Sequence, residues 1–375
     1  MLLDIQNKTS KGWRKVKLRE WLNFKYGFGL PKKKRQKGDV AVYGSSGVVG
    51  WHNEAKVKNS GIIIGRKGNV GAVYFSEKSF YPIDTVYFVD SLKKKGDLKF
   101  FYYLLKTINF QKVDINVGVP GLSRETALDL EVLIPENSEE QRRITDILSA
   151  FDEKIEVNNK INQILEEMAQ TIFKEWFVTP NMIGNINKKW QILDTQEILV
   201  FEKGIEPGSR YYSEKRKDGC IPFYRVRDLD KVTGVDVYIP EEIAQGKTCK
   251  ENDVLLSLDA TVGRVKIGCN GVFSSGIRKV YSKDGFIKNS FIYFWLKTPY
   301  VQNTILEHAS GTTISHAGQA IKYLKLPFNK EVIQKIQTKV DPMFKKILQV
   351  LKENQKLSAL RDLLLPRLMS GEIRV

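Results

Sequence analysis

The sequence predicts an α+β protein in which a β-rich α/β domain followed by a long helix occurs twice. Three observations support this fold class: an internal repeat, short strand-like runs in each half, and a long apolar helical pattern after each set of runs. A chain of 375 residues is also too long for one ordinary hydrophobic core, so two or more domains are expected.

The internal repeat consists of short matches at a nearly constant spacing. Val70-Gly71 and Val262-Gly263 lie 192 residues apart. Residues 38–43 match residues 219–224 at a spacing of 181, so we expect an insertion in the second half near residues 230–245. Long-period repeats of this kind indicate that one structural unit is present twice.

Strand-like runs occupy residues 13–135 and 190–327. Runs such as "GIIIG" and "VLLSL" are separated by Gly, Asn, Asp and Ser, which is typical of strands joined by turns. A short helix is expected in each half, at residues 98–107 and 289–298. The glycines at positions 65, 68 and 71 fit neither common phosphate-binding loop, so we interpret them as turn residues.

A long helix is expected after each set of strands. Ser138 and Gln141 predict a capping box at the start of the first helix, and Asn329 predicts an N-cap for the second. Pro342 predicts a kink or a new start in the second helix, with Asp341 as its cap.

Apolar residues in both helices recur at alternating steps of four and three, which is the 3.5-residue period of a coiled coil. We expect the two helices to be each other's partners, although each could instead pack only on its own β-rich domain. Asn162 and Asn354 are expected at equivalent seam positions, where a polar residue specifies register. The predicted seam residues are Ile144, Leu148, Phe151, Ile155, Asn162, Leu165, Ile172, Ile336, Val340, Ile347, Asn354, Leu357 and Leu364.

The charge predicts a polyanionic partner. Sixty Lys and Arg residues against 43 Asp and Glu give a net charge of +17. Such an excess favours nucleic acid, because cations that contact phosphate release counterions; a generally basic protein is the alternative. No apolar run reaches the ~20 residues of a membrane span. Three cysteines without a C-x-x-C pair favour reduced thiols and a cytoplasmic location.

The sequence predicts no catalytic or metal-binding residues. An adenine methyltransferase needs a [DN]-P-P-[YF] tetrapeptide, and the nearest match, residues 341–344, lacks the second proline. The three histidines, His52, His308 and His316, have no zinc-ligand spacing. We therefore expect a DNA-binding protein that has no cofactor of its own.

Three segments resemble the specificity subunits of type I restriction–modification systems. Residues 135–178, "PENSEEQRRITDILSAFDEKIEVNNKINQILEEMAQTIFKEWFV", resemble the central conserved region of these subunits. Residues 50–89 resemble a frequent type of their target-recognition domain, and "LLLPRLMSGEI" at residues 363–373 resembles the end of their C-terminal conserved region. Arg361, at a seam position, departs from the family pattern.

The resemblance implies a division of the chain into four segments. Residues 1–134 and 181–328 are expected to be target-recognition domains, each reading one half of a split DNA target. Residues 135–180 and 329–375 are expected to be conserved helices that pack antiparallel as a spacer, with pseudo-twofold symmetry.

The resemblance also implies partners. Methyltransferase subunits, two in number, would dock onto the chain and bind S-adenosylmethionine, and restriction/translocase subunits would complete the complex. Two alternatives stay open: a standalone DNA-binding regulatory or architectural protein, and an enzyme with an unrecognised site.

Candidate DNA contacts follow from residue chemistry. Arg and Lys can pair with guanine or phosphate, Asn with adenine, and Ser or Thr with phosphate. In the first half we select Lys32, Lys33, Lys34, Arg35, Tyr43, Ser45, Ser46, Arg66, Lys67, Asn69 and Arg124. In the second half we select Tyr224, Arg225, Arg227, Thr261, Arg264, Arg278, Lys279, Ser315 and His316.

Overall fold

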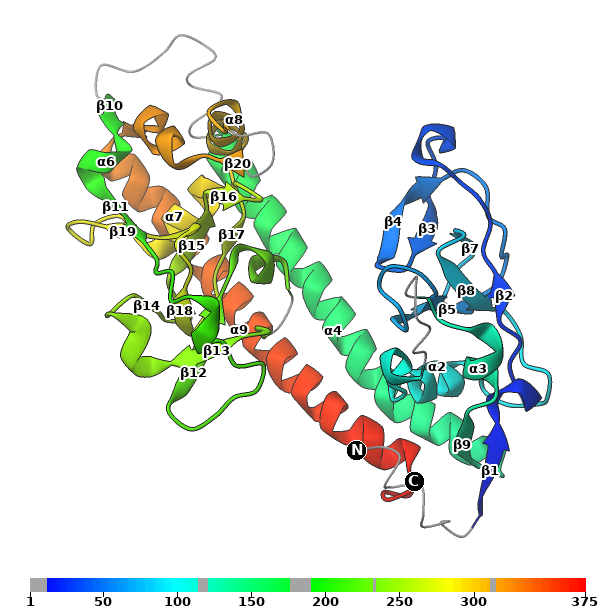
Figure 1. Ribbon diagram of the computed structural model, residues 1–375. Helices are drawn as coiled ribbons and strands as arrows, with labels where there is room; N and C mark the ends of the chain where they lie inside the picture. The colour runs from blue at the N-terminus through cyan, green and yellow to red at the C-terminus, as the bar shows by residue number, and fades with distance from the viewer. Residues whose placement is uncertain (1–11, 114–120, 176–189, 232–233, 311–314) are drawn as a thin grey trace. The chain divides into compact units, whose positions relative to one another are not determined.

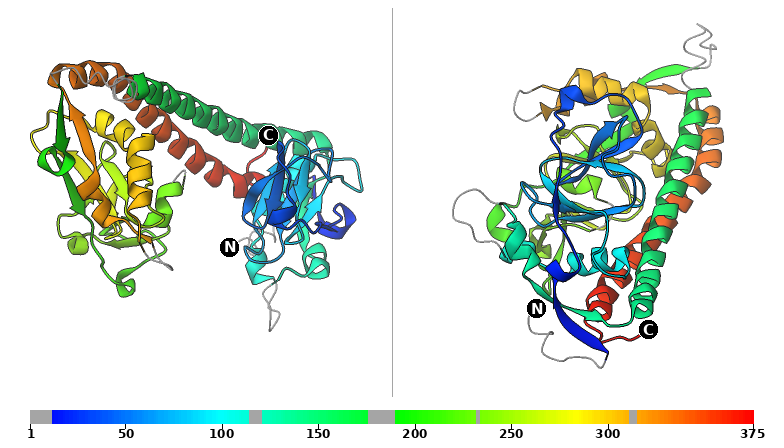
Figure 2. Two further views of the ribbon diagram at one scale, coloured as in Figure 1. Left: turned by 90° about the horizontal axis from the view of Figure 1, so that it is seen from above. Right: turned by 90° about the vertical axis from the view of Figure 1, so that its right-hand side faces the viewer.

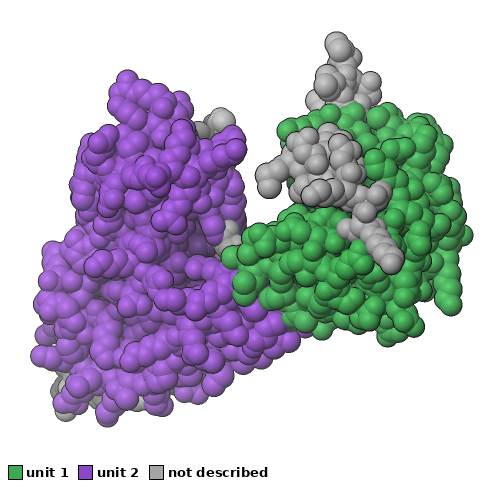
Figure 3. Space-filling model, turned by 90° about the horizontal axis from the view of Figure 1, so that it is seen from below, with its two compact units in different colours: residues 1–153, 359–375 green, residues 154–358 purple. Residues whose placement is uncertain are grey.

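The computed structural model describes residues 12–113, 121–175, 190–231, 234–310 and 315–375. The chain forms two compact units, Met1–Glu153 with Ala359–Val375 (unit 1) and Lys154–Ser358 (unit 2), which are coloured separately in Figure 3. Each unit contains part of both long helices, so the units do not coincide with the four expected segments. That four-segment division stays a prediction.

Unit 1 contains two small sheets and a two-stranded ribbon (Figure 1). Most strand pairs in unit 1 are antiparallel. The fully buried strand β5 is an inner strand of the four-stranded sheet. That sheet has the order β2 (Lys25–Tyr26), β8 (Val86–Val89), β5 (Gly61–Gly65), β6 (Val73–Ser76). The second sheet has the order β4 (Gly47–His52), β3 (Val40–Gly44), β7 (Phe80–Pro82), and the ribbon pairs β1 (Trp13–Lys17) with β9 (Glu131–Pro135). Its short helices are η1 (Leu18–Glu20), η2 (Lys32–Lys34), α2 (Leu98–Lys106), η3 (Phe110–Lys112) and α3 (Arg124–Leu128).

Unit 2 repeats this plan. One sheet has the order β11 (Leu199–Lys203), β19 (Ile277–Ser282), β15 (Val254–Ser257), β17 (Val265–Lys266). The other has the order β13 (Tyr238–Pro240), β12 (Cys220–Tyr224), β18 (Gly271–Phe273), β14 (Thr248–Cys249). Two ribbons pair β10 (Gln191–Asp194) with β21 (Lys325–Phe328) and β16 (Asp259–Ala260) with β20 (Ser315–His316). The short helices are α6 (Thr195–Ile198), η5 (Ser209–Tyr211), η6 (Val226–Asp230), η7 (Glu241–Ala244), α7 (Asn289–Leu296), α8 (Pro299–Glu307) and η8 (Gly318–Tyr323).

The predicted internal repeat is confirmed by matching backbone contacts. Strands β3 and β7 pair in parallel with Tyr43 opposite Pro82, and β12 and β18 do so with Tyr224 opposite Phe273. A two-residue turn joins β3 to β4, whereas residues 225–237 separate β12 from β13. The predicted insertion is therefore this longer connection, which contains η6.

The two long helices are α4 (Ser138–Phe173) and α9 (Lys330–Met369). In unit 2 they run antiparallel (Figures 1 and 2): Asn158 contacts Asn354, while Ala169, further along α4, shares a core with Val340. In unit 1, Ile144 and Leu148 of α4 share the core with Leu368 of α9. The predicted pairing of the helices is thus confirmed, and all the predicted seam residues are buried or partly buried.

The equivalence of Asn162 and Asn354 was predicted wrongly. Asn158 Nδ2 donates to Asn354 Oδ1 at 2.8 Å, across a sequence separation of 196 residues. Gln141 and Gln337, separated by the same number of residues, also have equivalent partners, because each accepts a hydrogen bond from the backbone at the start of a short helix. A shift of four residues is about one helical turn, so the apolar pattern cannot distinguish the two alignments.

The expected helix ends are partly corrected. Asn329 does cap α9, accepting from Val332 N at 3.2 Å. At α4, however, the Asn137 side chain accepts from Glu139 N at 2.9 Å, and Gln141 donates to Pro135 O instead of closing a capping box with Ser138.

Pro342 does not start a new helix, since one helix continues from Lys330 to Met369. Pro342 lies on the exposed side, where water can satisfy the carbonyl that loses its partner, while Val340 and Phe344 beside it are buried. Asp341 does not act as a cap: its carboxylate accepts from Lys288 at 2.5 Å and from Ser290.

Arg361 is accommodated at the seam by a charged partner. Its guanidinium donates to Asp152 at 2.5 Å, and the Tyr103 hydroxyl donates to the other carboxylate oxygen at 2.7 Å. Burial raises the pKa of Tyr103 above its usual range, which keeps its hydroxyl a donor. The seam therefore carries an ion pair in unit 1 and an amide pair in unit 2.

We predict that the asparagine pair is coupled. Replacing Asn354 with Leu removes one of the two acceptors of the buried Asn158 amide nitrogen and leaves only Glu353 Oε2 at 3.0 Å, which should cost about 1–3 kcal/mol. The double change Asn158→Leu with Asn354→Leu should unfold at a higher temperature than either single variant, because the amide pair is then removed as a whole. Thermal unfolding measures this, with the exposed Gln349→Leu as control. Single-variant effects that simply add would contradict the coupling.

Two equivalent glycines are predicted to be irreplaceable. A Cβ at Gly27 would overlap the carbonyl oxygen of Ile83, and one at Gly204 would overlap that of Phe273. Gly27→Ala and Gly204→Ala should each destabilise the chain by about 1–3 kcal/mol, as overpacking does. Gly29→Ala is the matched control, since nothing lies within 4 Å of its Cβ position. Equal melting temperatures for the three variants would refute this account.

Candidate nucleic-acid interface

The turn between β5 and β6 brings several predicted contact residues together in unit 1. Arg66 N and Lys67 N both donate to Thr85 O, at 2.9 and 3.2 Å, and Leu122 N donates to Arg66 O at 2.9 Å. Gly68 has a φ of +77°, a conformation that favours glycine. These bonds place the turn beside the start of α3, which carries Arg124.

An exposed tyrosine joins the two arginines of this region. Tyr26 is 50% exposed, and the guanidinium carbons of Arg66 and Arg124 lie 5.1 and 5.4 Å from its ring centroid. Beneath it, burial raises the pKa of Tyr87 to about 12, and the Tyr87 hydroxyl donates to Leu122 O. We call Tyr26, Arg66, Lys67, Asn69 and Arg124 the first turn cluster.

The β3–β4 hairpin lies beside this cluster. Tyr74, which neighbours the turn, donates its hydroxyl to Ser45 O at 3.4 Å, and a Cβ on Gly68 would lie 3.1 Å from Ser45 Oγ. Ser46 is exposed. Tyr43 is only partly exposed and packs its ring edge-on against Phe80, so it supports the hairpin.

The basic run Lys32-Lys33-Lys34-Arg35 contains two kinds of residue. Lys32, Lys33 and Lys34 form η2 and are exposed, with no ion pair to any described residue. Arg35 is partly buried, and its guanidinium donates to Val49 O at 2.7 Å. Arg35 thus stabilises β4. Of these four residues, only the three lysines are free to contact a phosphate.

The equivalent turn in unit 2 follows β15. Ser257 N donates to Arg264 O and Gly263 N to Ser257 O, just as Gly65 and Gly71 are bonded in unit 1. Asp259 pairs with His316 across the β16–β20 ribbon, with 2.7 Å between Oδ1 and Nδ1.

Other predicted contacts gather around this second turn. Thr261 is exposed, and Arg264 pairs with Asp230 and donates to Val226 O on η6. Arg227, also on η6, has a side chain that is 66% exposed. We call Arg227, Asp259, Thr261, Arg264 and His316 the second turn cluster.

Four other predicted contacts in unit 2 have internal partners. Tyr224 is a core residue, 8% exposed, whose hydroxyl accepts from Asn270 N, so a DNA contact by its side chain is contradicted. Lys279 pairs with Glu202 at 2.9 Å, Arg225 pairs with the buried Asp228 at 3.0 Å, and Arg278 donates to Ser275 O at 2.6 Å. Burial lowers the pKa of Arg278. Ser315 pairs with Ala260 in the β16–β20 ribbon.

Asp259 was missed by the sequence reasoning, which looked for cations and amides only. A signal was available, because Asp259 is 192 residues from Lys67 and therefore occupies the same position of the repeat. An aspartate in the second copy at the position of Lys67 in the first indicates that the two turns differ chemically.

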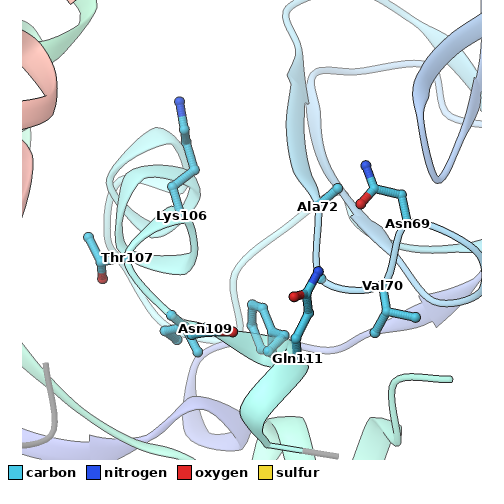
Figure 4. Close-up of a pocket in the computed structure, with 10 residues that line it drawn as sticks. Asn69, Val70, Ala72, Lys106, Thr107, Asn109 and Gln111 are labelled. Atoms are coloured by element: carbon cyan, nitrogen blue, oxygen red, sulfur yellow. The ribbon is translucent and has the colours of Figure 1, made fainter. Parts of the chain in front are cut away.

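One hollow of about 380 Å³ opens beside the first turn cluster (Figure 4). Asn69, Val70 and Ala72 form one side, and Lys106, Thr107 and Asn109, from the end of α2, form the other. Its lining has one cation and no acid. Within the described ranges no group of three or more His, Cys, Asp or Glu could hold a metal ion. No helix in the part of the chain that the structure describes is long and apolar enough to cross a membrane.

Comparisons with known proteins agree with this architecture. A family model described as "Type I restriction modification DNA specificity domain" matches residues 10–167 and again 187–357. The MjaIX specificity subunit of Methanocaldococcus jannaschii is 29% identical over 306 residues, covering 74% of this chain and 69% of the relative. The HindI specificity subunit of Haemophilus influenzae is 23% identical over 333 residues, covering 68% and 71%.

A solved structure shows the same fold. The S subunit of a type I restriction–modification system from M. genitalium superposes with a TM-score of 0.58 at 20% identity, covering 97% of this chain and 98% of that one. Because the family model matches most of the sequence in two copies, the chain belongs to the type I restriction–modification DNA specificity family.

Proposed function

We propose that this chain is the DNA-recognition subunit of a type I restriction–modification complex and that its two recognition domains read the two halves of a bipartite target. The observation that carries this proposal is the repeated turn. The same backbone hydrogen bonds hold the turn after β5 and the turn after β15. Each turn presents exposed polar side chains from a fixed scaffold, which is where binding residues are usually found.

Lys32, Lys33 and Lys34 would bind phosphate, and the first and second turn clusters would meet base edges. A net charge of +17 favours this partner, because phosphate contacts release counterions. Residues 1–134 and 181–328 are proposed as the recognition domains, and residues 135–180 and 329–375 as the helices between them.

The partners follow from the family. The relatives' names describe specificity subunits of restriction enzymes, so we assign this chain to a complex with methyltransferase and restriction subunits. Two methyltransferase subunits fit the repeated helices, and S-adenosylmethionine would bind to them. The chain itself is assigned no catalytic role. Its free cysteines support a reducing, cytoplasmic setting.

Purification from the native host, together with mapping of methylated adenines, tests the proposal. A co-purifying methyltransferase and a bipartite methylated motif are the expected results. An isolated chain that binds DNA, in a host without such a motif, would instead support a standalone DNA-binding regulator.

We predict that the three η2 lysines contribute equally to the binding of target and non-target DNA. Replacing Lys32, Lys33 and Lys34 by Ala should weaken binding to target and random duplexes to the same degree. The slope of log K against log salt should become shallower by ~2.7, about 0.9 for each lost phosphate contact. The control replaces three exposed lysines of α9, Lys335, Lys345 and Lys346, and should leave the slope nearly unchanged. Equal slopes for both triple variants would show that η2 does not touch DNA.

We predict that the recognition domains are exchangeable. Replacing residues 13–134 with the corresponding domain of another family member should change only one half of the methylated motif, since the second turn cluster lies wholly in unit 2. Genome-wide methylation mapping reads both halves at once. A motif altered in both halves would contradict independent reading.

A further inference from the structure

We propose that Asp259 is a specificity-determining residue that accepts a hydrogen bond from the exocyclic amino group of a base in the second half-site. This inference rests on the proposed function and deepens it, because it names the chemistry that one recognition domain selects. Asp259 lies two residues after the end of β15, at the start of β16, inside the turn that the hydrogen bond from Gly263 N to Ser257 O closes.

Only one oxygen of Asp259 is occupied. Oδ1 lies 2.7 Å from His316 Nδ1, whereas Oδ2 forms no hydrogen bond with any described residue. The Asp259 side chain is 28% exposed and that of His316 is 61% exposed. Asp259 Oδ1 and His316 Nδ1 therefore bond to each other, while Asp259 Oδ2 and the other side of the imidazole ring are available to a ligand.

The hydrogen bond between Asp259 and His316 determines whether the remaining polar atoms of the pair donate or accept. A carboxylate oxygen can only accept, so the proton of this bond lies on Nδ1. In a neutral imidazole with the proton on Nδ1, the other nitrogen, Nε2, is an acceptor. With the imidazole neutral, the free groups of the pair, Asp259 Oδ2 and His316 Nε2, both accept hydrogen bonds.

An acceptor-only pair on a DNA-binding surface selects its partner. Phosphate oxygens also accept and carry negative charge, so they are repelled. In the major groove, the donors are the N4 amino group of cytosine and the N6 amino group of adenine. Aspartate is suited to cytosine in particular, because it can accept from N4.

An exposed arginine lies on the short helix beside Asp259. The side chains of Asp259 and Val226 both flank Gly276, within 3.1 Å of its Cβ position, so η6 lies beside the acid. Arg227 on η6 is well exposed and can meet phosphate while Asp259 faces a base.

The equivalent position in unit 1 has the opposite chemistry. Lys67 stands where Asp259 stands, at the 192-residue spacing, and it bridges to Gly121 as Asp259 bridges to His316. The Lys67 side chain only donates and matches the O6 and N7 acceptors of guanine, and Gly121 places no side chain beside it. One scaffold therefore offers donors in the first recognition domain and acceptors in the second.

The test is a binding panel with the purified full-length chain in complex with its methyltransferase. Duplexes carry the methylated motif with each base pair of the second half-site replaced in turn. Asp259→Asn keeps the side-chain size but adds a donor. At one C·G or A·T pair, discrimination should fall by roughly 5- to 150-fold, as for the loss of one good base contact. All other positions, and the whole first half-site, should change by less than about twofold.

Glu242→Gln is the matched control, since it removes an exposed carboxylate from η7 in the same unit and should leave every position unchanged. If Asp259→Asn does not fold in a thermal melt, His316→Phe removes the second acceptor and should weaken discrimination at the same pair. Adenine and cytosine are distinguished by which pair responds. Unchanged discrimination at every position in a folded variant would overturn the inference. A wild-type complex without any preference in either half-site would instead refute the proposed function.

Discussion

One buried glutamine in each unit fixes a recognition domain to a long helix. Gln141 of α4 accepts from the backbone of Asp97, at the start of α2, and Gln337 of α9 accepts from that of Lys288, at the start of α7. Both side chains are at most 3% exposed. A buried amide without these bonds would be strongly unfavourable, so the position of each short helix on its long helix is closely specified.

Charged groups strengthen the same attachment further along each short helix. In unit 1, Tyr103 binds Asp152, which also holds Arg361. In unit 2, Tyr293 donates to Glu166, and Lys297 pairs with the same carboxylate at 2.5 Å. These contacts are partly buried, so they resist screening better than surface ion pairs. Each domain is thereby held on the helix pair by apolar packing and by directional hydrogen bonds and ion pairs.

The two copies of the repeat share their backbone contacts and differ in the side chains at their turns. Backbone hydrogen bonds and the close approaches at Gly27 and Gly204 recur in both units, because they build the scaffold. The side chains at the turns differ, with Lys67 in one copy and Asp259 in the other. The scaffold can therefore keep its shape while the side chains at the turns change, which is the behaviour expected of functional loops on a rigid framework.

The sequence by itself determined the repeat, the strand-rich texture, the two long helices and the basic charge, because each is a pattern of local spacing or composition. It could not determine the alignment of the helices, since a four-residue shift keeps the apolar face, whereas polar contacts such as Asn158–Asn354 and Arg361–Asp152 select one register. Nor could it show that Pro342 would lie on the exposed side of an unbroken helix. Tertiary structure alone decided which cations are free: Lys279 and Arg225 meet acids distant in sequence or hidden in a turn, whereas Lys32 to Lys34 meet none in the described part of the chain. The reason is physical: a charge's availability depends on what the fold brings within a few ångströms of it, and local sequence does not contain that information.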